Sequence, residues 1–590
     1  MTIPLRGSAA AREAGAESVP EGGGRGDGVE LREVTPQQRE PVLRGRLGLL
    51  QIGERLPRRT ILWGWLGPLL MTILGGVLRL VNLDHPERIM FDETYYVKDA
   101  FTLDRFGFST KWEPIDEDNP NHYFNQGDHR EMTDVPSYVV HGELGKWLIA
   151  LGMRLFGADN GLGWRFAAAV AGTLMVFLVG RIALRLFRSA TLATLTAGLV
   201  AIDGIGLTLS RIGLLDVFLA LFILLGFWAV LRDRDASRAH MARRYAADDW
   251  WQHPKGPGTG FRGWLVLAGV FIGGAAGVKW SGFYAAAVLG LAAWLWDLSA
   301  RRLLGVRRPV SGSILRGGVP AFLAFVPTTI AAYLASWFSW FTHPGSYMHQ
   351  WAADLRSSGQ HPPRAWMPDT LNSFLQYHLQ MYDFHSGLDS EHTYQAHPIG
   401  WLLQIRPTLF YWQGYDDVDQ QALCGADRCV GVITALGNPF IWWSAALALL
   451  LVTWLAVRCR DGRAGIILTG YAATYLPWFL YMNRTVFNFY TITILPFVAL
   501  ALAYAIGIIT QRLPLASAWD PEALRSSRRF RFPGLRSGDQ HGVRTQRIGI
   551  VVSSVVLILA VLATVFWWPI WTGMVVGYEF WHVHTWLLTW

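Results

Sequence analysis

Long apolar runs recur from one end of the chain to the other, and they restrict its possible folds more than any other feature. Stretches of about 18 to 25 apolar residues are long enough to cross the hydrocarbon core of a bilayer as helices. Only 16% of the 590 residues are charged, whereas 52% are apolar. The chain is therefore predicted to be an all-α polytopic membrane protein with about eleven transmembrane helices, near 61–82, 163–187, 190–209, 212–231, 263–282, 283–300, 315–342, 436–457, 464–482, 486–510 and 548–569.

The connections between these runs carry charges that predict their sides of the membrane. If the N-terminus is inside, the long inner connections are rich in arginine, as the positive-inside rule requires; they are 232–262, 301–314, 458–463 and 511–547. The first large outer connection, 84–143, is acidic instead. We expect a multi-pass protein of the cell membrane with a cytoplasmic N-terminus. The inner arginines also account for the net charge of +8 without a nucleic-acid partner.

Composition divides the chain into three parts. Residues 1–59 are polar and rich in Gly, Glu and Arg, without the apolar core of a signal peptide, and are predicted to be a disordered cytoplasmic tail. Residues 60–569 form the transmembrane domain, and 570–590 an extracytoplasmic segment. The second outer loop, 343–435, is too long for a passive connection and is expected to fold as a cap over the outer face.

Cysteines and histidines give little sign of a metal site. Cys424 and Cys429 lie in the second outer loop, where a disulfide and two free thiols both remain open, and Cys459 lies at the inner surface. Three scattered cysteines do not suit structural zinc. The spacing of three loop histidines fits ordinary surface residues better than ligands; they are His385, His392 and His397. No cofactor is predicted, and the need for a divalent cation is left open.

Two adjacent carboxylates, Asp92 and Glu93, follow the first apolar run and are flanked by Tyr95 and Tyr96. A solvated loop has the same appearance, so the surroundings must decide. A charge in hydrocarbon costs about 3 kcal/mol by insertion scales, yet the topology collects four cations at the outer ends of the helices, namely Arg165, Arg211, Lys279 and Arg484. Each alone could snorkel to the interface, but together they favour an anionic ligand such as a lipid phosphate.

A helical bundle with two outer loops would also suit a lipid or solute transporter. Transporters are commonly built from paired repeats with broken helices, and we find no convincing internal repeat in this chain. The charged residues at the outer helix ends therefore favour an enzyme.

Six blocks, taken in order, resemble those of the protein O-mannosyltransferases, most closely the actinobacterial type. They cover the chain from about residue 61 to 569. The blocks are FDETYYVKDAF at 91–101, HGELGKWLIALG at 141–152, GWRFAAAVAG at 163–172, SRIGLLDVF at 210–218, GAAGVKWSGFY at 274–284 and YLPWFLYMNRTVFNFY at 475–490.

This resemblance implies a GT-C fold and the transfer of mannose from polyprenyl-phosphate-mannose to Ser or Thr of proteins on the extracytoplasmic face, by inversion. The Sec translocon is a further expected partner. Asp92 is implied as the general base, with Glu93 ordering the loop or contacting the acceptor or a cation. Arg165 and Lys279, followed by Arg211 and Arg484, are candidates for the donor phosphate. Residues expected around the substrates are Tyr95, Tyr96, His141, Lys146, Trp280 and Tyr490.

Two questions stay open from the residues alone. Arg165 has a second possible role, which is to pair with Glu93 and position it. The family commonly has His-Pro-Pro-Leu-Gly-Lys where this chain has HGELGK at 141–146, so the backbone is expected to be softer there, with Glu143 as an added carboxylate. The sugar and acceptor cannot be read from the residues, and another GT-C transferase acting on an arabinosyl or glycolipid acceptor is the nearest rival.

Overall fold

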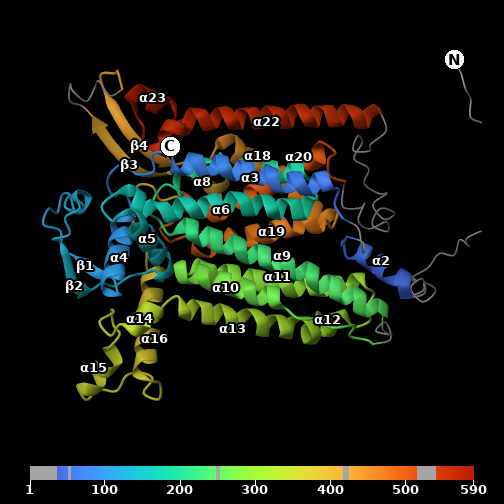
Figure 1. The fold of residues 1–590 in the computed structure, drawn as a ribbon, viewed down its shortest axis with the longest axis horizontal. Coiled ribbons are helices and arrows are strands. Elements are labelled where there is room, and N and C mark those ends of the chain that lie inside the picture. The colour runs from blue at the N-terminus through green and yellow to red at the C-terminus, as the bar shows by residue number, and fades with distance from the viewer. Residues whose placement is uncertain (1–35, 51–54, 248–252, 416–423, 515–539) are drawn as a thin grey trace, which may run out of the picture.

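A bundle of roughly parallel helices forms the body of the protein in the computed structural model (Figure 1), which describes residues 36–50, 55–247, 253–415, 424–514 and 540–590. Within these ranges, six helices are long and apolar enough to cross a membrane. They are α3 (Arg58–Leu80), α6 (Gly161–Phe187), α11 (Ser281–Leu303), α12 with η3 and α13 (Pro309–Ser313, Ile314–Gly318 and Val319–Ala335), α18 (Pro439–Arg458) and α22 (Gln540–Thr572).

Six further helices complete the bundle in the described ranges, and all but one of them are short. They are α7 (Ala190–Ala201), α8 (Gly204–Thr208), α9 (Asp216–Ala247, the one long member), α10 (Gly263–Val278), α19 (Gly462–Thr474) and α20 (Leu495–Ile509). Each of the eleven segments predicted to span the membrane coincides with one or two helices of the bundle. The membrane-integral character is thereby supported, while the number of spans stays a prediction.

Local chemistry explains why some predicted spans are broken. Between α7 and α8, the Asp203 carboxylate accepts hydrogen bonds from the backbone N–H groups of Ile205 and Gly206, at 3.0 and 3.2 Å. This cap starts a new helix inside the apolar run. The α19 helix ends at Thr474, shortly before Pro477, and the chain continues as the 3₁₀ helices η5 (Leu476–Tyr481) and η6 (Asn488–Thr493).

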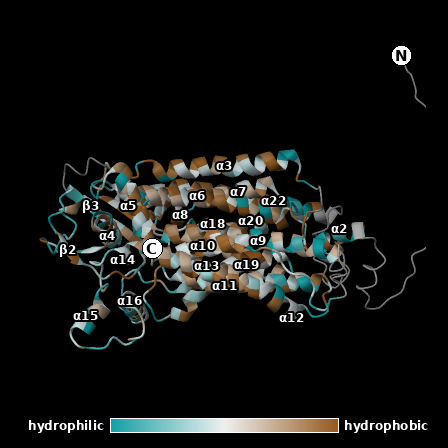
Figure 2. Ribbon diagram, turned by 60° about the horizontal axis from the view of Figure 1, so that its bottom comes forward, coloured by the Kyte–Doolittle hydropathy of each residue, from teal (hydrophilic) through white to brown (hydrophobic). Residues whose placement is uncertain are grey.

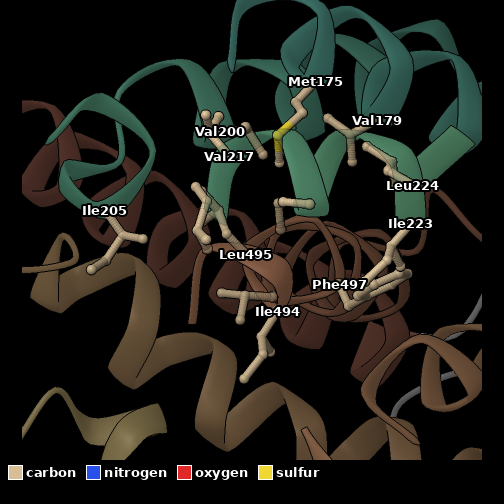
Figure 3. Packing of buried hydrophobic residues seen from close by; sticks show 14 of the residues in the cluster. Met175, Val179, Val200, Ile205, Val217, Ile223, Leu224, Ile494, Leu495 and Phe497 are labelled. Atoms are coloured by element: carbon tan, nitrogen blue, oxygen red, sulfur yellow. The ribbon is translucent and has the colours of Figure 1, made fainter. Parts of the chain in front are cut away.

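Large apolar side chains from α6, α7, α9 and α20 interdigitate at the centre of the bundle (Figure 3). Met175 and Val179 of α6 lie opposite Leu495 and Phe497 of α20, all nearly inaccessible to solvent. The outward faces of α3, α13 and α22 are also apolar, with side chains such as Ile73, Leu323 and Val565 exposed. Exposed apolar helix faces of this extent are suited to hydrocarbon rather than water, and Figure 2 shows the hydrophilic residues gathered at the two ends of the bundle.

Both predicted outer loops fold at one end of the bundle (Figure 1), which we call the site end. The helices of the site end are α4 (Glu93–Phe106), η1 (Phe124–Gln126), α5 (Leu144–Phe156), α14 (Phe338–Thr342), α15 (Trp351–Ser357), α16 (Asp369–Ser386), η4 (Pro398–Leu403) and α23 (Tyr578–Val583).

The fold is not purely α-helical, because the site end contains two small antiparallel sheets. One pairs β1 (Thr110–Trp112) with β2 (Met132–Pro136). The other has the order β3-β4-β5 and comprises Thr408–Tyr415, Cys429–Ala435 and Val575–Gly577. Cys424 and Cys429, left open from the sequence, form a disulfide, and Cys429 is the first residue of β4. The prediction missed these strands because four of them lie within the two long outer connections and the fifth, β5, lies in the short segment after α22.

Part of the predicted disordered tail is ordered and packs against the opposite end of the bundle. Residues Pro36–Arg46 form helix α2, and the side chains of Leu43 and Leu47 are completely buried against residues of α9 and α11. Arg238 of α9 donates a hydrogen bond to the carbonyl oxygen of Leu47 at 2.8 Å. Two buried leucines are enough to dock a segment whose overall composition is polar. Residues 1–35 and 51–54 of the predicted tail lie outside the described residues.

Candidate active site

Asp92 is the residue that directly precedes α4, and its carboxylate is held beside a charged cluster. Phe91 adopts a left-handed backbone conformation with φ of 50°, and its ring packs against Phe410 and Phe489, with centroids 4.8 and 5.7 Å apart. Among the described residues, no hydrogen bond to the Asp92 carboxylate is formed. Burial raises the pKa of Asp92 to about 6, Lys279 opposes that rise, and the Asp216 carboxylate adds to it.

Glu93 has a different environment, although it is the next residue. Its carboxylate is completely buried and receives two hydrogen bonds from Arg165, Nε to Oε1 at 2.8 Å and Nη2 to Oε2 at 3.0 Å. The backbone N–H groups of Gly213 and Met90 donate to the same carboxylate at 2.7 and 3.0 Å. A carboxylate so fully satisfied holds three segments of the chain together. Of the two roles expected for Glu93, the structure favours ordering the loop.

Two of the four predicted phosphate-binding cations donate their hydrogen bonds to acceptors within the protein. Besides Glu93, Arg165 donates to the carbonyl oxygens of Leu83, Asp84, Pro86 and Arg88, at 2.9 to 3.3 Å. Arg211 donates to the carbonyl oxygens of Leu78, Arg79, Val81 and Asn82 around the C-terminus of α3. Helix C-termini leave carbonyl groups unsatisfied, and a guanidinium suits them well. These two arginines therefore shape the 78–88 connection that leads to Asp92, and neither is among the residues that line the pocket described below.

Lys279 remains at the centre of the cluster. It follows the last residue of α10, and its Nζ donates to Asp216 Oδ2, at the start of α9, at 2.7 Å. The same ammonium lies 5.8 Å from the ring centroid of Tyr96 and 5.4 Å from that of Tyr490. Aromatic faces stabilise a cation at such distances. Lys279, Asp216 and Asp92 thus form a compact group in which one positive charge faces two carboxylates.

A pocket with about 970 Å³ of empty space, including solvent at its mouth, opens beside this group. We call it the central pocket. One side is polar and includes Lys279, Asp216 and Arg484. The other side is apolar and includes Ile223 of α9 and Trp478 of η5. A pocket that is charged at one side and apolar at the other fits a ligand with a charged head and a hydrocarbon tail.

Arg484 is the second cation of the central pocket with donor capacity to spare. Its Nη2 contacts Nδ1 of His385 at 3.2 Å, while its Nε is buried and has no hydrogen-bond partner in the described part of the chain. The ring of His385 stacks on that of His141, with centroids 5.2 Å apart. Burial and the neighbouring cations lower the pKa of both histidines, that of His385 to about 4. Both rings are therefore neutral at physiological pH, and the cationic groups here are Lys279 and Arg484.

Comparison with known proteins identifies the family. A model of dolichyl-phosphate-mannose-protein mannosyltransferases matches residues 157–335, and one of the C-terminal transmembrane region of protein O-mannosyltransferases matches residues 370–590. The polyprenol-phosphate-mannose–protein mannosyltransferase of Mycobacterium tuberculosis is 31% identical over 545 residues, which cover 89% of this chain and 92% of the relative. The chain belongs to the protein O-mannosyltransferase family. The predicted family is confirmed.

Two further comparisons extend this result. The protein of the same name from Mycolicibacterium smegmatis is 32% identical over 538 residues, covering 89% of this chain and 93% of that one. A solved structure of the Saccharomyces cerevisiae protein O-mannosyltransferase Pmt1–Pmt2 complex, bound to the sugar donor, aligns over 91% of this chain and 93% of its own with a TM-score of 0.61 and 16% identity. The predicted GT-C fold is thereby confirmed.

The remaining predicted substrate residues of this protein O-mannosyltransferase separate into two groups. His141, Trp280 and Tyr490 line the central pocket, and Tyr96 faces Lys279 as described. Tyr95 is exposed on the far side of α4, and Lys146 is buried in an ion pair with Asp99 at 3.0 Å. Neither of these last two residues lines the central pocket.

The unusual HGELGK segment has a physical explanation. A Cβ atom at Gly142 would lie 2.1 Å from the carbonyl oxygen of Gly277 at the end of α10, so this position requires glycine. Glu143 is nearly inaccessible, and burial raises its pKa to about 8. It accepts a hydrogen bond from the backbone N–H of Trp340 at 3.3 Å. Glu143 therefore ties α5 to α14 as a neutral acid, and the expected extra carboxylate near the site is not formed at physiological pH.

Sequence reasoning overlooked two residues of the site. Asp216 lies in the SRIGLLDVF block, but it was not among the predicted site residues. His385 was interpreted as an ordinary surface histidine, but it lines the central pocket; His392 and His397 are exposed. Within the described residues, no group of three or more His, Cys, Asp or Glu side chains is placed to hold a metal ion.

Proposed function

We propose that this chain transfers mannose from polyprenyl-phosphate-mannose to Ser or Thr hydroxyl groups of proteins on the extracytoplasmic face of the membrane, with Asp92 as the general base. Relatives that cover nearly the whole chain carry the name of this activity. One observation carries the mechanistic part. Among the described residues, the Asp92 carboxylate has no hydrogen-bond partner. Its pKa is raised to about 6, and it interacts electrostatically with Lys279 and Asp216, which line the central pocket. A base with a pKa near the working pH is the most effective.

The central pocket fits the donor in one orientation. The polyprenyl chain would lie along its apolar side, near Ile223 and Trp478, and the phosphate would meet Lys279 and the unpartnered Nε of Arg484. Negative charge grows on this phosphate as the glycosidic bond breaks. Fixed cations that stabilise such charge commonly contribute about 3 kcal/mol each, or about a hundredfold in rate.

The transfer itself needs a single displacement. The acceptor hydroxyl oxygen attacks C1 of mannose while Asp92 takes its proton, and the bond between C1 and the phosphate oxygen breaks on the opposite face. The electron pair of that bond leaves with the polyprenyl phosphate, and the configuration at C1 inverts. Glu93 and Arg165 do not contact the reacting atoms. Their ion pair fixes the turn that contains Asp92 and so positions the base.

The side of the membrane is proposed from the distribution of charge. The end of α11 and its connection to α12 lie at the end opposite to the site (Figure 1) and are rich in arginine, with Arg301, Arg302, Arg307 and Arg308. The positive-inside rule places that end in the cytoplasm, so the site end faces outward in the cell membrane. A protein acceptor must cross the membrane before it meets this site, which makes the Sec translocon its natural supplier.

Substituting the proposed base tests this function. Asp92→Asn keeps the size of the side chain but cannot take a proton, so mannosyl transfer to a Ser/Thr-rich peptide should be abolished while binding of the donor lipid persists. Asp134→Asn, which changes an exposed acid of the same loop, should retain activity. The assay offers labelled polyprenyl-phosphate sugars to purified enzyme in lipid vesicles, and near wild-type transfer by Asp92→Asn would exclude Asp92 as the base. Preference for an arabinosyl donor or a glycolipid acceptor would favour the rival transferase.

A further inference from the structure

A second, open hollow lies next to the central pocket and shares Arg484 with it. Its walls include Glu391, His392, His397 and Arg406 from the segment that follows α16, and Arg484 and Val486 from the turn before η6. We call it the polar groove. It contains about 1100 Å³ of empty space, including the solvent at its open side, and it lacks the apolar wall of the central pocket. A polyprenyl chain would gain little there, whereas a solvated polypeptide would fit.

Backbone hydrogen bonds hold the segment that follows α16 against the turn before η6. Ala396 donates a backbone hydrogen bond to Val486 at 2.8 Å, and Thr485 donates one to Leu388 at 3.2 Å. His392 Nδ1 accepts from the N–H of Tyr394, and His397 Nδ1 accepts from the N–H of Ile399. In a neutral imidazole this leaves Nε2 as the protonated nitrogen, so both rings can donate a hydrogen bond to peptide carbonyl groups.

Two guanidinium groups give the polar groove its charge. Arg406 is exposed and uses Nη2 for one hydrogen bond, to the carbonyl oxygen of Thr393 at 2.6 Å. Within the described parts of the chain, neither Arg406 nor Arg484 forms an ion pair with a carboxylate. Glu391 lies in the same hollow and offsets one of the two positive charges. The polar groove therefore has a net positive charge and guanidinium N–H groups that can donate hydrogen bonds to a bound ligand.

An aromatic bridge connects the polar groove with Asp92. The ring of His392 contacts Phe487 at 4.9 Å between centroids, and Phe487 contacts Phe91 at 6.4 Å. Phe91 is the residue before Asp92. An extended peptide covers this path in about three residues. A chain lying in the groove can thus place one hydroxyl at Asp92 while a side chain about three residues away remains near His392, inside the polar groove that Arg406 also lines.

We propose that the polar groove binds the acceptor polypeptide and that Arg406 selects acceptors with a carboxylate about three residues from the modified Ser or Thr. This inference rests on the proposed mannosyl transfer and adds its acceptor specificity. The donor occupies the central pocket, and Arg484 at the boundary contacts both substrates. Arg406 contributes to acceptor binding and takes no part in the chemistry.

Three synthetic peptides test the proposal on the wild-type enzyme. They share one acceptor Thr and differ only at the positions three residues before and after it, which hold Glu, Gln or Lys. We expect the KM for the Glu peptide to be about tenfold below that for the Lys peptide, with kcat unchanged, and the difference to shrink as salt is added. Equal KM values for all three peptides would overturn the proposal while leaving mannosyl transfer intact. Failure to mannosylate any of the peptides would refute the proposed function instead.

Variants then assign the preference to one residue. Arg406→Gln should remove the difference between the Glu and Lys peptides, and Arg406→Glu should reverse it, with an unchanged KM for the donor showing that the site is intact. Arg105→Gln, an exposed arginine of α4 at the same end of the protein, serves as the matched control and should keep the wild-type preference. Retention of the Glu preference by a folded Arg406→Glu enzyme would contradict the role of Arg406.

Discussion

The dependence of activity on pH offers a quantitative test of Asp92. Its pKa is raised from the ordinary aspartate value of 3.8 to about 6, chiefly by burial. A base acts only when it is deprotonated, so activity is full well above pH 6 and falls as the pH decreases through that value. At pH 5, about one-tenth of the enzyme has Asp92 ionised, and kcat/KM should be about tenfold below its plateau. An ordinary aspartate would lose less than about a tenth of its activity at that pH.

The neighbouring charges predict how the fall of kcat/KM at low pH, the acid limb of the pH profile, shifts in variants. Asp216 raises the pKa of Asp92 and Lys279 lowers it. In Asp216→Asn, the acid limb should therefore shift to lower pH, and in Lys279→Met the residual activity should have its limb at higher pH. Initial rates at subsaturating peptide and fixed donor, measured in vesicles from pH 4.5 to 8, give kcat/KM for each enzyme, with Asp134→Asn as the control. A limb near pH 4 in the wild type, or limbs that do not move in the two variants, would refute the assignment.

Three further results are expected. Arg165→Met leaves the buried Glu93 carboxylate unpaired, so it should destabilise the protein by about 3 to 5 kcal/mol and lower its thermal midpoint in detergent; an unchanged midpoint with only a raised KM for the donor would restore Arg165 to the phosphate site. Lys279→Met and Arg484→Met should each reduce kcat/KM for the donor by about a hundredfold, and unaltered donor saturation would contradict their role. Alkylation of the denatured, unreduced protein should modify only Cys459 of the three cysteines, as counted by mass spectrometry, since Cys424 and Cys429 are bonded; three modified thiols would disprove the disulfide.

The sequence predicted the helical bundle, the end that contains the site and several residues that meet there. Apolar run length placed a helix at every expected span, and the positions of Asp92, Lys279 and Arg484 relative to those runs predicted that they would gather at one end. The breaks inside the runs were harder to predict. A cap such as Asp203 or a proline such as Pro477 interrupts a helix without changing the apolar composition of its surroundings.

The roles of the four cations could not be separated from the sequence, because the deciding partners are backbone groups. Arg165 and Arg211 donate to carbonyl oxygens of the 78–88 connection. Every residue has a backbone carbonyl group, so the sequence does not indicate the direction in which these carbonyl groups point. Within the ranges that the structure describes, the Lys279 ammonium has no such backbone partner, and it lines the central pocket. Helix α2 was missed for a related reason, since its docking combines two buried leucines with arginine hydrogen bonds to the carbonyl oxygens of Leu47 and Gly48 in a polar segment.

The central claim is that Asp92, Lys279 and Arg484 converge on the phosphate and the mannose of one lipid donor. A cryo-EM structure of the Asp92→Asn enzyme with polyprenyl-phosphate-mannose bound tests it directly. We predict phosphate oxygens within hydrogen-bond distance of Lys279 Nζ and Arg484 Nε, with C1 of mannose facing residue 92. A phosphate bound instead to Arg165 or Arg211, or a sugar remote from residue 92, would contradict the account.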